Sequence, residues 1–204
     1  MKNSPARLTT PVLALAIALL ILGAAFRVIR LEALPQLPNF APLMAIAICG
    51  ALLLPGWMAL VVPFSALLVS DLLLNFHYGA AAFGSGEILR YSVYAVGIAA
   101  GLVLRRRQAS PLPIFAAVSA SSLLFYLVTN TAAWFGNVAY PQSLGGLVQS
   151  LTVGLPGFPP TWVFFRNSLV SDLLFTAIIL GVVAVARNVS SRPVALPADA
   201  RQAA

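Results

Sequence analysis

Charged residues are scarce in this sequence. Only 8% of its 204 residues are charged, whereas 60% are hydrophobic, so the chain has too few polar side chains to cover a soluble globule of this size. The solvent for most of its surface must therefore be lipid. The composition predicts an integral membrane protein.

Cysteine and histidine are nearly absent. Cys49 is the one cysteine, which excludes an intramolecular disulfide and any metal site built from several cysteines. His77 is the one histidine, so a serine nucleophile has little choice of base, and Ser70 and Ser171 point about 100° away from the aspartates beside them on a helix. No glycine-rich phosphate loop is present. We therefore expect neither an enzyme nor a bound cofactor.

Basic residues outnumber acidic ones, and the net charge is +7. The one basic run, Arg105 to Arg107, lies between apolar segments and contains no interleaved aromatic residue. Membrane topology explains such a run better than nucleic-acid binding does. We expect the lipid bilayer, and no nucleic acid, among the partners of the chain.

Long apolar segments are what the sequence does contain. A helix needs about 20 apolar residues to cross the hydrocarbon core, with about 17 to 25 observed. This length predicts an all-α, polytopic membrane protein whose single transmembrane domain covers residues 1–187 and has six helices, at Pro11 to Phe26, Ala41 to Leu54, Trp57 to Phe76, Ile88 to Leu104, Leu112 to Phe135 and Trp162 to Ala186. The second segment is short, so tilting, extension through Asn39 and partial insertion stay open.

The distribution of positive charge predicts the orientation. With the N-terminus inside, eight basic residues face the cytoplasm and four face outward, which places both termini in the cytoplasm. The inner set is Lys2, Arg7, Arg105, Arg106, Arg107, Arg187, Arg192 and Arg201, and the outer set is Arg27, Arg30, Arg90 and Arg166.

The two ends of the chain raise separate questions. A basic start and a short apolar run that ends at Gly23-Ala24-Ala25 fit either a cleaved signal peptide or a retained first helix, and we favour the retained helix. Residues 188–204 are polar, contain proline and lack periodicity. This composition predicts a disordered cytoplasmic tail.

The hexapeptide LVSDLL occurs twice, in the third and the sixth predicted helix, and each copy buries an aspartate, Asp71 or Asp172. Three helices per half would make the halves run in opposite directions, so the copies fit either an inverted repeat or a chance match. An ionisable residue inside a membrane helix costs at least a few kcal/mol and needs a partner. We predict that Asp71 pairs with Arg166, and that Asp172 is held by a neutral donor of the fifth helix, such as Asn130 or Thr129.

Polar residues inside the helices fall near the outer side, together with an aromatic rim. They form the predicted ligand-binding set, which is Asn39, Asp71, His77, Tyr78, Glu87, Arg90, Asn130, Trp134, Arg166, Asn167 and Asp172. Three interpretations stay open: an internal clamp that fixes the packing of the helices, a solute site, or a relay for protons or ions. His77 and Trp134 also fit an interfacial role.

Three segments carry a resemblance to known proteins. At LPNFAPLMAIAI (37–48), VSDLLLNFHYG (69–79) and FRNSLVSDLLFTA (165–177), the chain is similar to a family of small bacterial membrane proteins of unassigned function. That family itself resembles the S components of energy-coupling-factor (ECF) vitamin transporters. The resemblance implies an S-component-like bundle in the bacterial inner membrane that captures a vitamin-like solute from the outer face. The loops that would capture it follow the first, third and fifth helices, at 27–40, 77–87 and 136–161.

The same resemblance implies partners. It suggests a transmembrane coupling subunit with ATPases, which would contact the small residues Ala14 and Ala18 on the first helix. Solitary cobalamin-transporting relatives make cobalamin the leading ligand, and His77 would hold a metal only if the solute were a cobalt corrinoid. The alternative is a structural or assembly membrane protein whose polar cluster is satisfied internally and which binds no solute.

Overall fold

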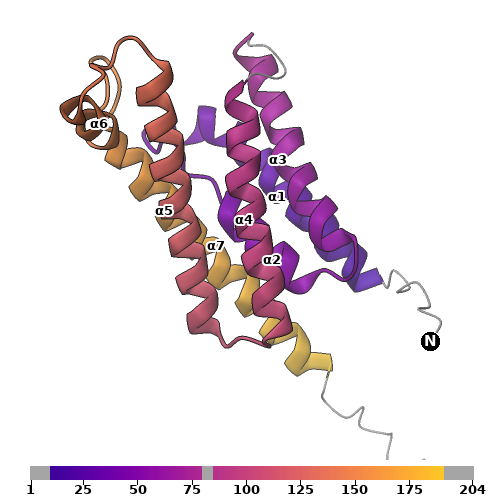
Figure 1. Ribbon diagram of the computed structural model, residues 1–204. Helices are drawn as coiled ribbons and strands as arrows, with labels where there is room; N and C mark the ends of the chain where they lie inside the picture. Colours follow the sequence, from indigo (N-terminus) through magenta and orange to yellow (C-terminus); the bar gives the residue numbers. More distant parts are fainter. Residues whose placement is uncertain (1–9, 80–84, 191–204) are drawn as a thin grey trace, which may run out of the picture.

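The computed structural model describes residues 10–79 and 85–190, which form helices joined by loops (Figure 1). These ranges contain seven helices and no strand, so the predicted all-helical class is confirmed. The helices are α1 (Thr10–Ala33), α2 (Leu43–Leu53), α3 (Met58–His77), α4 (Ser85–Arg106), α5 (Pro111–Gly136), α6 (Leu144–Leu151) and α7 (Thr161–Ser190).

Four helices in the described ranges are long and apolar enough to cross a membrane, at Met58–His77, Gly86–Arg106, Pro111–Gly136 and Thr161–Ala186. The six predicted crossings are therefore not confirmed. α2 has 11 residues, and a helix of this length is about 16 Å long, roughly half of the hydrocarbon core. It is too short to cross a membrane alone. The crossing by α1, which has 24 residues, stays a prediction.

α2 lies at the centre of the bundle and contacts α1, α3, α4, α5 and α7. Every residue from Met44 to Ala51 is buried. The sequence of α2, LMAIAICGALL, carries no charged side chain, as expected of a helix that is surrounded by other helices. Of the alternatives that the sequence left open for this segment, a helix that extends through Asn39 is wrong, because α2 begins at Leu43, and partial insertion stays a prediction.

Small residues let the neighbouring helices approach α2 closely. A Cβ atom on Gly101 of α4 would lie 2.5 Å from the carbonyl oxygen of Ile48 and 2.8 Å from the Cβ of Ala51. Because any side chain at Gly101 would collide with the α2 backbone, glycine is what permits this contact. α4 and α2 are consequently packed backbone against backbone.

Several predicted boundaries change. α1 continues to Ala33 rather than ending at Phe26, so Arg27 lies on a helix and not in a loop. α7 continues through Ser190, so residues 188–190 of the predicted tail belong to a helix, and the rest of that tail lies outside the described residues. The short helix α6 is a new element within the predicted loop 136–161.

The two ends of the bundle are built differently (Figure 1). The turn between α4 and α5, which follows the basic run at Arg105, lies at one end, and α6 lies at the other end with the start of α7. Charge counting predicts that the end with α6 faces outward. That orientation stays a prediction, as do the positions of Lys2 and Arg7, which lie outside the described residues.

Candidate functional site

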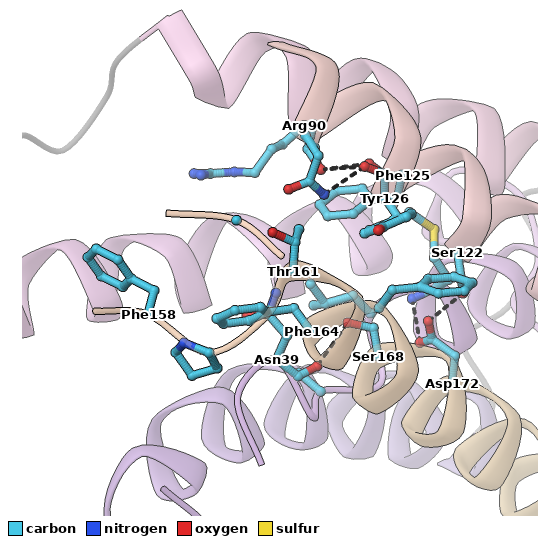
Figure 2. Close-up of a pocket in the computed structure, with 18 of the residues that line it drawn as sticks. Asn39, Arg90, Ser122, Phe125, Tyr126, Phe158, Thr161, Phe164, Ser168 and Asp172 are labelled. Atoms are coloured by element: carbon cyan, nitrogen blue, oxygen red, sulfur yellow. Dashed lines mark hydrogen bonds between the residues drawn. The ribbon is translucent and has the colours of Figure 1, made fainter. Parts of the chain in front are cut away.

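A cavity of about 460 Å³ lies at the end of the bundle that holds α6, and Figure 2 shows its lining residues in close-up. Its walls come from α1, α2, α3, α4, α5 and α7 and from the segment around α6, and they are mainly apolar. The aromatic lining residues are Phe125, Tyr126, Tyr140, Phe158, Phe164 and Phe165, and the neutral polar ones are Asn39, Ser122, Thr129, Asn130, Thr161 and Ser168. The charged ones are Arg27, Arg90 and Asp172.

Asp172 lies at one side of the cavity and is only 2% exposed. Its Oδ1 accepts hydrogen bonds from the backbone N–H groups of Met44 at 2.9 Å and Ala45 at 3.2 Å. Its Oδ2 accepts a hydrogen bond of 2.6 Å from the hydroxyl of Ser122. Three neutral donors from α2 and α5 therefore hold the carboxylate of α7.

These bonds cap the start of α2. The first N–H groups of a helix have no partner within the helix, and Pro42, which precedes α2, forms no side-chain cap. Asp172 supplies the missing acceptor from another helix, and its negative charge is favourable at a helix N-terminus. Because Met44, Ala45 and Asp172 are buried, the protein itself supplies this cap in place of water.

The end of α2 has a matching partner of the opposite charge. Arg105 of α4 donates a hydrogen bond of 2.5 Å from Nη1 to the carbonyl oxygen of Leu54. A positive group is favourable at a helix C-terminus for the same reason that a negative one is favourable at the N-terminus. The two charged side chains thus satisfy both termini of a short helix inside the bundle.

Asp71 belongs to a second charged cluster, which joins α1, α3 and α4. Its Oδ1 lies 2.5 Å from Nη1 of Arg27, and this nitrogen also donates to the hydroxyl of Ser70 at 2.7 Å. Its Oδ2 lies 3.6 Å from Nη2 of Arg90, which donates to Glu87 at 2.7 Å. Asp71 does not line the cavity, but both arginines do.

The predicted pairing of Asp71 with Arg166 is wrong. Arg166 is exposed, donates to Oδ1 of Asn167 at 3.0 Å, and lies 5.3 Å from the ring centroid of Trp162. The reason is that α3 packs against α1, α2 and α4, and has no contact with α7 in the described ranges. The extension of α1 brings Arg27 to Asp71 instead.

The prediction that a neutral donor of the fifth predicted helix holds Asp172 is confirmed, but the donor is neither Asn130 nor Thr129. A hydroxyl of the fifth predicted helix is the partner, yet it belongs to Ser122, which lies about two turns before Thr129 and Asn130. Those two side chains donate to carbonyl oxygens of their own helix, Phe125 and Tyr126 respectively. They line the cavity without contacting Asp172.

The segment around α6 covers part of the cavity. Several residues between 137 and 160 contribute to the lining, namely Tyr140, Gly154, Leu155, Phe158 and Pro159. The segment is attached to α5, because the hydroxyl of Tyr126 donates to the carbonyl oxygen of Leu151 and Nε1 of Trp134 donates to that of Pro141 at 2.9 Å. The predicted loop 136–161 therefore lies against the cavity.

The predicted ligand-binding residues fall into several groups. Those that line the cavity are Asn39, Arg90, Asn130 and Asp172, and Asp71 and Glu87 contact its arginines. Asn167 donates to the carbonyl oxygen of Pro38 at 2.9 Å, and Trp134 holds the segment before α6, so both position loops. His77 and Tyr78 are exposed at the end of α3, and neither lines the cavity.

Arg27 and Ser122 are two of the lining residues that the predicted set does not contain. Arg27 falls just after the predicted end of the first helix, and its partner Asp71 is 44 residues away in the chain, so no local pattern links them. Ser122 did offer a signal, because SASS (residues 119–122) interrupts an apolar segment with three hydroxyl groups. Two of these, on Ser121 and Ser122, are buried.

Comparison with known proteins gives one result. A family model described as "Family of unknown function (DUF6580)" matches residues 7–195. No significant match was found among curated proteins or among solved structures. The match agrees with the predicted resemblance to a membrane protein family of unassigned function, and it contains no link to the S components.

Proposed function

The chain belongs to a family of unknown function, DUF6580, and on that premise we propose that it is a membrane-embedded capture protein that binds a small, ring-containing solute in its cavity. The observation that carries the proposal is the cavity itself. Ligand sites commonly measure about 300 to 1,000 Å³ and combine an apolar, aromatic lining with a few polar groups. The cavity of about 460 Å³ has both properties.

Two polar lining residues have hydrogen-bonding capacity to spare. Asn130 uses its amide nitrogen on the carbonyl oxygen of Tyr126 at 2.8 Å, and within the described ranges its Oδ1 makes no hydrogen bond. Asn39 bonds to Ser168 only through its backbone oxygen, at 3.0 Å. An amide side chain directed at a solute is a common source of specificity, because it can donate and accept.

The site suits a flat ring better than a long chain. Six aromatic side chains line the cavity, and the rings of Tyr126 and Phe165 are stacked with their centroids 4.7 Å apart. Aromatic solutes gain contact energy from offset or edge-to-face packing on such rings. The neutral polar groups would then orient the edge of the ring.

In this proposal the solute enters from the outer face of the bacterial inner membrane, and both termini are cytoplasmic. The support is the charge asymmetry of the sequence, because the cavity lies at the end of the bundle away from Arg105. A vitamin-like solute fits the proposal, but cobalamin does not. A corrinoid is several times larger than the drug-sized molecules that fill a cavity of this volume, and His77 does not line it.

We propose that the protein captures the solute but does not transport it across the membrane by itself. After Thr176, α7 continues with the apolar stretch AIILGVVAVA, which offers no polar path toward the inner face. Release to the cytoplasm would then require a partner, such as a coupling subunit with ATPases. Ala14 and Ala18 are exposed on α1, where such a subunit would find small residues that permit close helix contact.

We do not propose an enzyme, because the described residues that line the cavity include one carboxylate and no histidine or cysteine. That carboxylate, Asp172, is already bonded to three donors and has a structural role. A general base needs to reach the proton that it removes, and the carboxylate of Asp172 already accepts hydrogen bonds from the N–H groups of α2.

A structural or assembly protein is the second candidate function. The observation in its favour is that both aspartates have partners within the bundle, Asp71 in ion pairs and Asp172 at α2. Neither needs a solute. A protein of this class would still contain a cavity, but no particular small molecule would occupy it.

Mass spectrometry of small molecules extracted from the purified protein separates the two candidates. The capture protein should retain one or a few solutes in stoichiometric amounts. The variant Asn130→Trp, which fills the cavity, should lose them, whereas Leu127→Trp, at an exposed position on the same helix, should keep them. Both variants should elute as monodisperse protein, to exclude misfolding.

Equal solute content in the two variants would contradict the proposed site. The absence of any enriched solute from the wild-type protein would favour the structural role instead.

A further inference from the structure

Two arginines from different helices line the same cavity. Arg27 comes from α1 and Arg90 from α4, and both contact one carboxylate, that of Asp71. Oδ1 lies 2.5 Å from Nη1 of Arg27, and Oδ2 lies 3.6 Å from Nη2 of Arg90. The shared carboxylate therefore holds the two guanidinium groups near each other at the wall of the cavity.

Both guanidinium groups carry N–H donors that form no hydrogen bond in the described ranges. A guanidinium group carries five N–H donors on three nitrogens. In the described ranges, the hydrogen bonds of Arg27 all leave from Nη1 and that of Arg90 leaves from Nη2. Nε of Arg90 is buried and has no partner. An unpaired buried donor is costly, so this group calls for an acceptor.

Asp172, the one acid among the described residues that line the cavity, has little capacity to accept further hydrogen bonds. Asp172 already accepts hydrogen bonds from Met44, Ala45 and Ser122. In Figure 2 Arg90 and Asp172 lie at opposite sides of the group of lining side chains. Most of the free hydrogen-bonding capacity among the charged lining residues is thus on donors, and it is concentrated at the arginines.

We propose that the solute carries a carboxylate, which binds to Arg27 and Arg90 while its ring packs on the aromatic lining. The inference rests on the proposed function and names the class of solute for the same cavity. A carboxylate matches the planar, two-pronged geometry of guanidinium donors. Because both arginines line the cavity, the carboxylate would reach their guanidinium groups from the cavity side.

Glu87 acts as a competitor in this arrangement. It accepts a hydrogen bond of 2.7 Å from Nη2 of Arg90, so that Arg27, Arg90, Asp71 and Glu87 together are formally neutral before the solute binds. A second carboxylate on Arg90 is opposed by the charge of Glu87. Neutralising Glu87 therefore strengthens binding, and neutralising Arg90 weakens it.

The test uses the full-length protein in lipid nanodiscs and matched probes that differ only in charge: benzoate with benzamide, and nicotinate with nicotinamide. The readout is the ligand-induced rise in the unfolding temperature as a function of probe concentration. Each carboxylate should give a saturable rise and each amide none. Octanoate, which has the same carboxylate without a ring, distinguishes a fatty acid from a ring-containing solute.

Variants assign the effect to the arginines. Arg90→Gln should weaken the binding of benzoate about tenfold or more, because it removes a charged donor. Glu87→Gln should strengthen the binding. Arg166→Gln is the matched control, because Arg166 does not line the cavity, and it should leave the affinity unchanged. A merely structural role would not make Arg90→Gln and Glu87→Gln act in opposite directions.

Equal effects of benzoate and benzamide, no response to any carboxylate, or weaker binding in Glu87→Gln would each overturn the inference. Tighter binding of octanoate than of benzoate would keep the arginine site and overturn the ring-containing solute. If extraction yields a neutral solute that Asn130→Trp loses, the proposed function stands and the carboxylate is excluded.

Discussion

The two copies of LVSDLL have identical residues but bury their aspartates in different surroundings. Asp71 on α3 lies between the arginines of α1 and α4, whereas Asp172 on α7 bonds only to neutral donors of α2 and α5. The partner is set by the helices that pack against each copy. α3 contacts α1 and α4, and α7 contacts α2 and α5. Identical local sequence therefore does not imply an identical role.

The two aspartates also differ in what offsets the cost of removing their charge from water. An ion pair inside a bundle has to offset the desolvation of two charges, and it leaves an uncompensated charge when one member is removed. A carboxylate at a helix N-terminus offsets its own desolvation through oriented N–H groups. Asp71 thus depends on charged side chains, and Asp172 depends on backbone groups.

Removing each carboxylate should separate the two roles most strongly. Asp172→Ala leaves the N–H groups of Met44 and Ala45 and the hydroxyl of Ser122 buried without an acceptor. We expect a loss of about 3 kcal/mol or more in the free energy of unfolding. Thermal unfolding of the purified protein in detergent would measure it as a large drop in the midpoint.

Asp71→Ala is the matched variant and should cost less. The side chains of Arg27 and Arg90 are 16% and 33% exposed, so water entering from the cavity screens the charges that are left unpaired. An equal drop in the unfolding midpoint for Asp71→Ala and Asp172→Ala would contradict the difference that we expect between the two sites.

Asparagine should rescue one site and not the other. In Asp172→Asn the amide oxygen can still accept from the backbone of α2, and the amide NH₂ can donate to Ser122. We expect this variant to recover most of the stability that alanine loses. In Asp71→Asn the neutral amide cannot balance Arg27, so we expect little recovery. Midpoints for all four variants, measured in one detergent, make the test, and rescue at 71 alone would reverse our assignment.

The other end of α2 sharpens the role assigned to Asp172. If that role is to terminate a short buried helix, then removing Arg105, which donates to the carbonyl oxygen of Leu54, should weaken the same helix. We expect Arg105→Ala to cost about 1 to 2 kcal/mol in the free energy of unfolding. Arg106→Ala is the control from the same exposed run, and an equal effect of both would indicate a general effect of charge.

The serine hydroxyls give the smallest expected effects. Ser122→Ala removes one of three donors to Asp172 and should cost about 1 kcal/mol. Ser70→Ala should cost less, because Arg27 keeps its ion pair with Asp71. The same unfolding measurements rank the two. A larger effect at Ser70 would mean that the hydroxyl, and not the ion pair, holds Arg27.

The sequence predicts the helices well and their partners poorly. Each of the six predicted segments overlaps a helix, because apolar runs of this length leave few alternatives in a membrane protein. The sequence does not predict α6, because LGGLVQSL is short and contains two glycines. Its one local signal is Ser143, whose hydroxyl accepts from the N–H of Gly146 as a helix cap.

Within the site, the burial of Asp71 and Asp172 could be predicted from the cost of a charge in lipid. Their partners could not. Met44 is 128 residues from Asp172, and Arg27 is 44 residues from Asp71, so both contacts depend on how the helices pack. Periodicity and composition describe one segment at a time and carry no information on which segments meet.

The capping of α2 by Asp172 also constrains the order in which the protein is assembled. Met44 leaves the ribosome 128 residues before Asp172, which is on the order of ten seconds of synthesis. During that interval the N–H groups of Met44 and Ala45 lack the acceptor that Asp172 supplies in the native structure, and the helix is too short to span the bilayer. We therefore expect the native centre of the bundle to form late in biogenesis, when α7 brings Asp172 to α2.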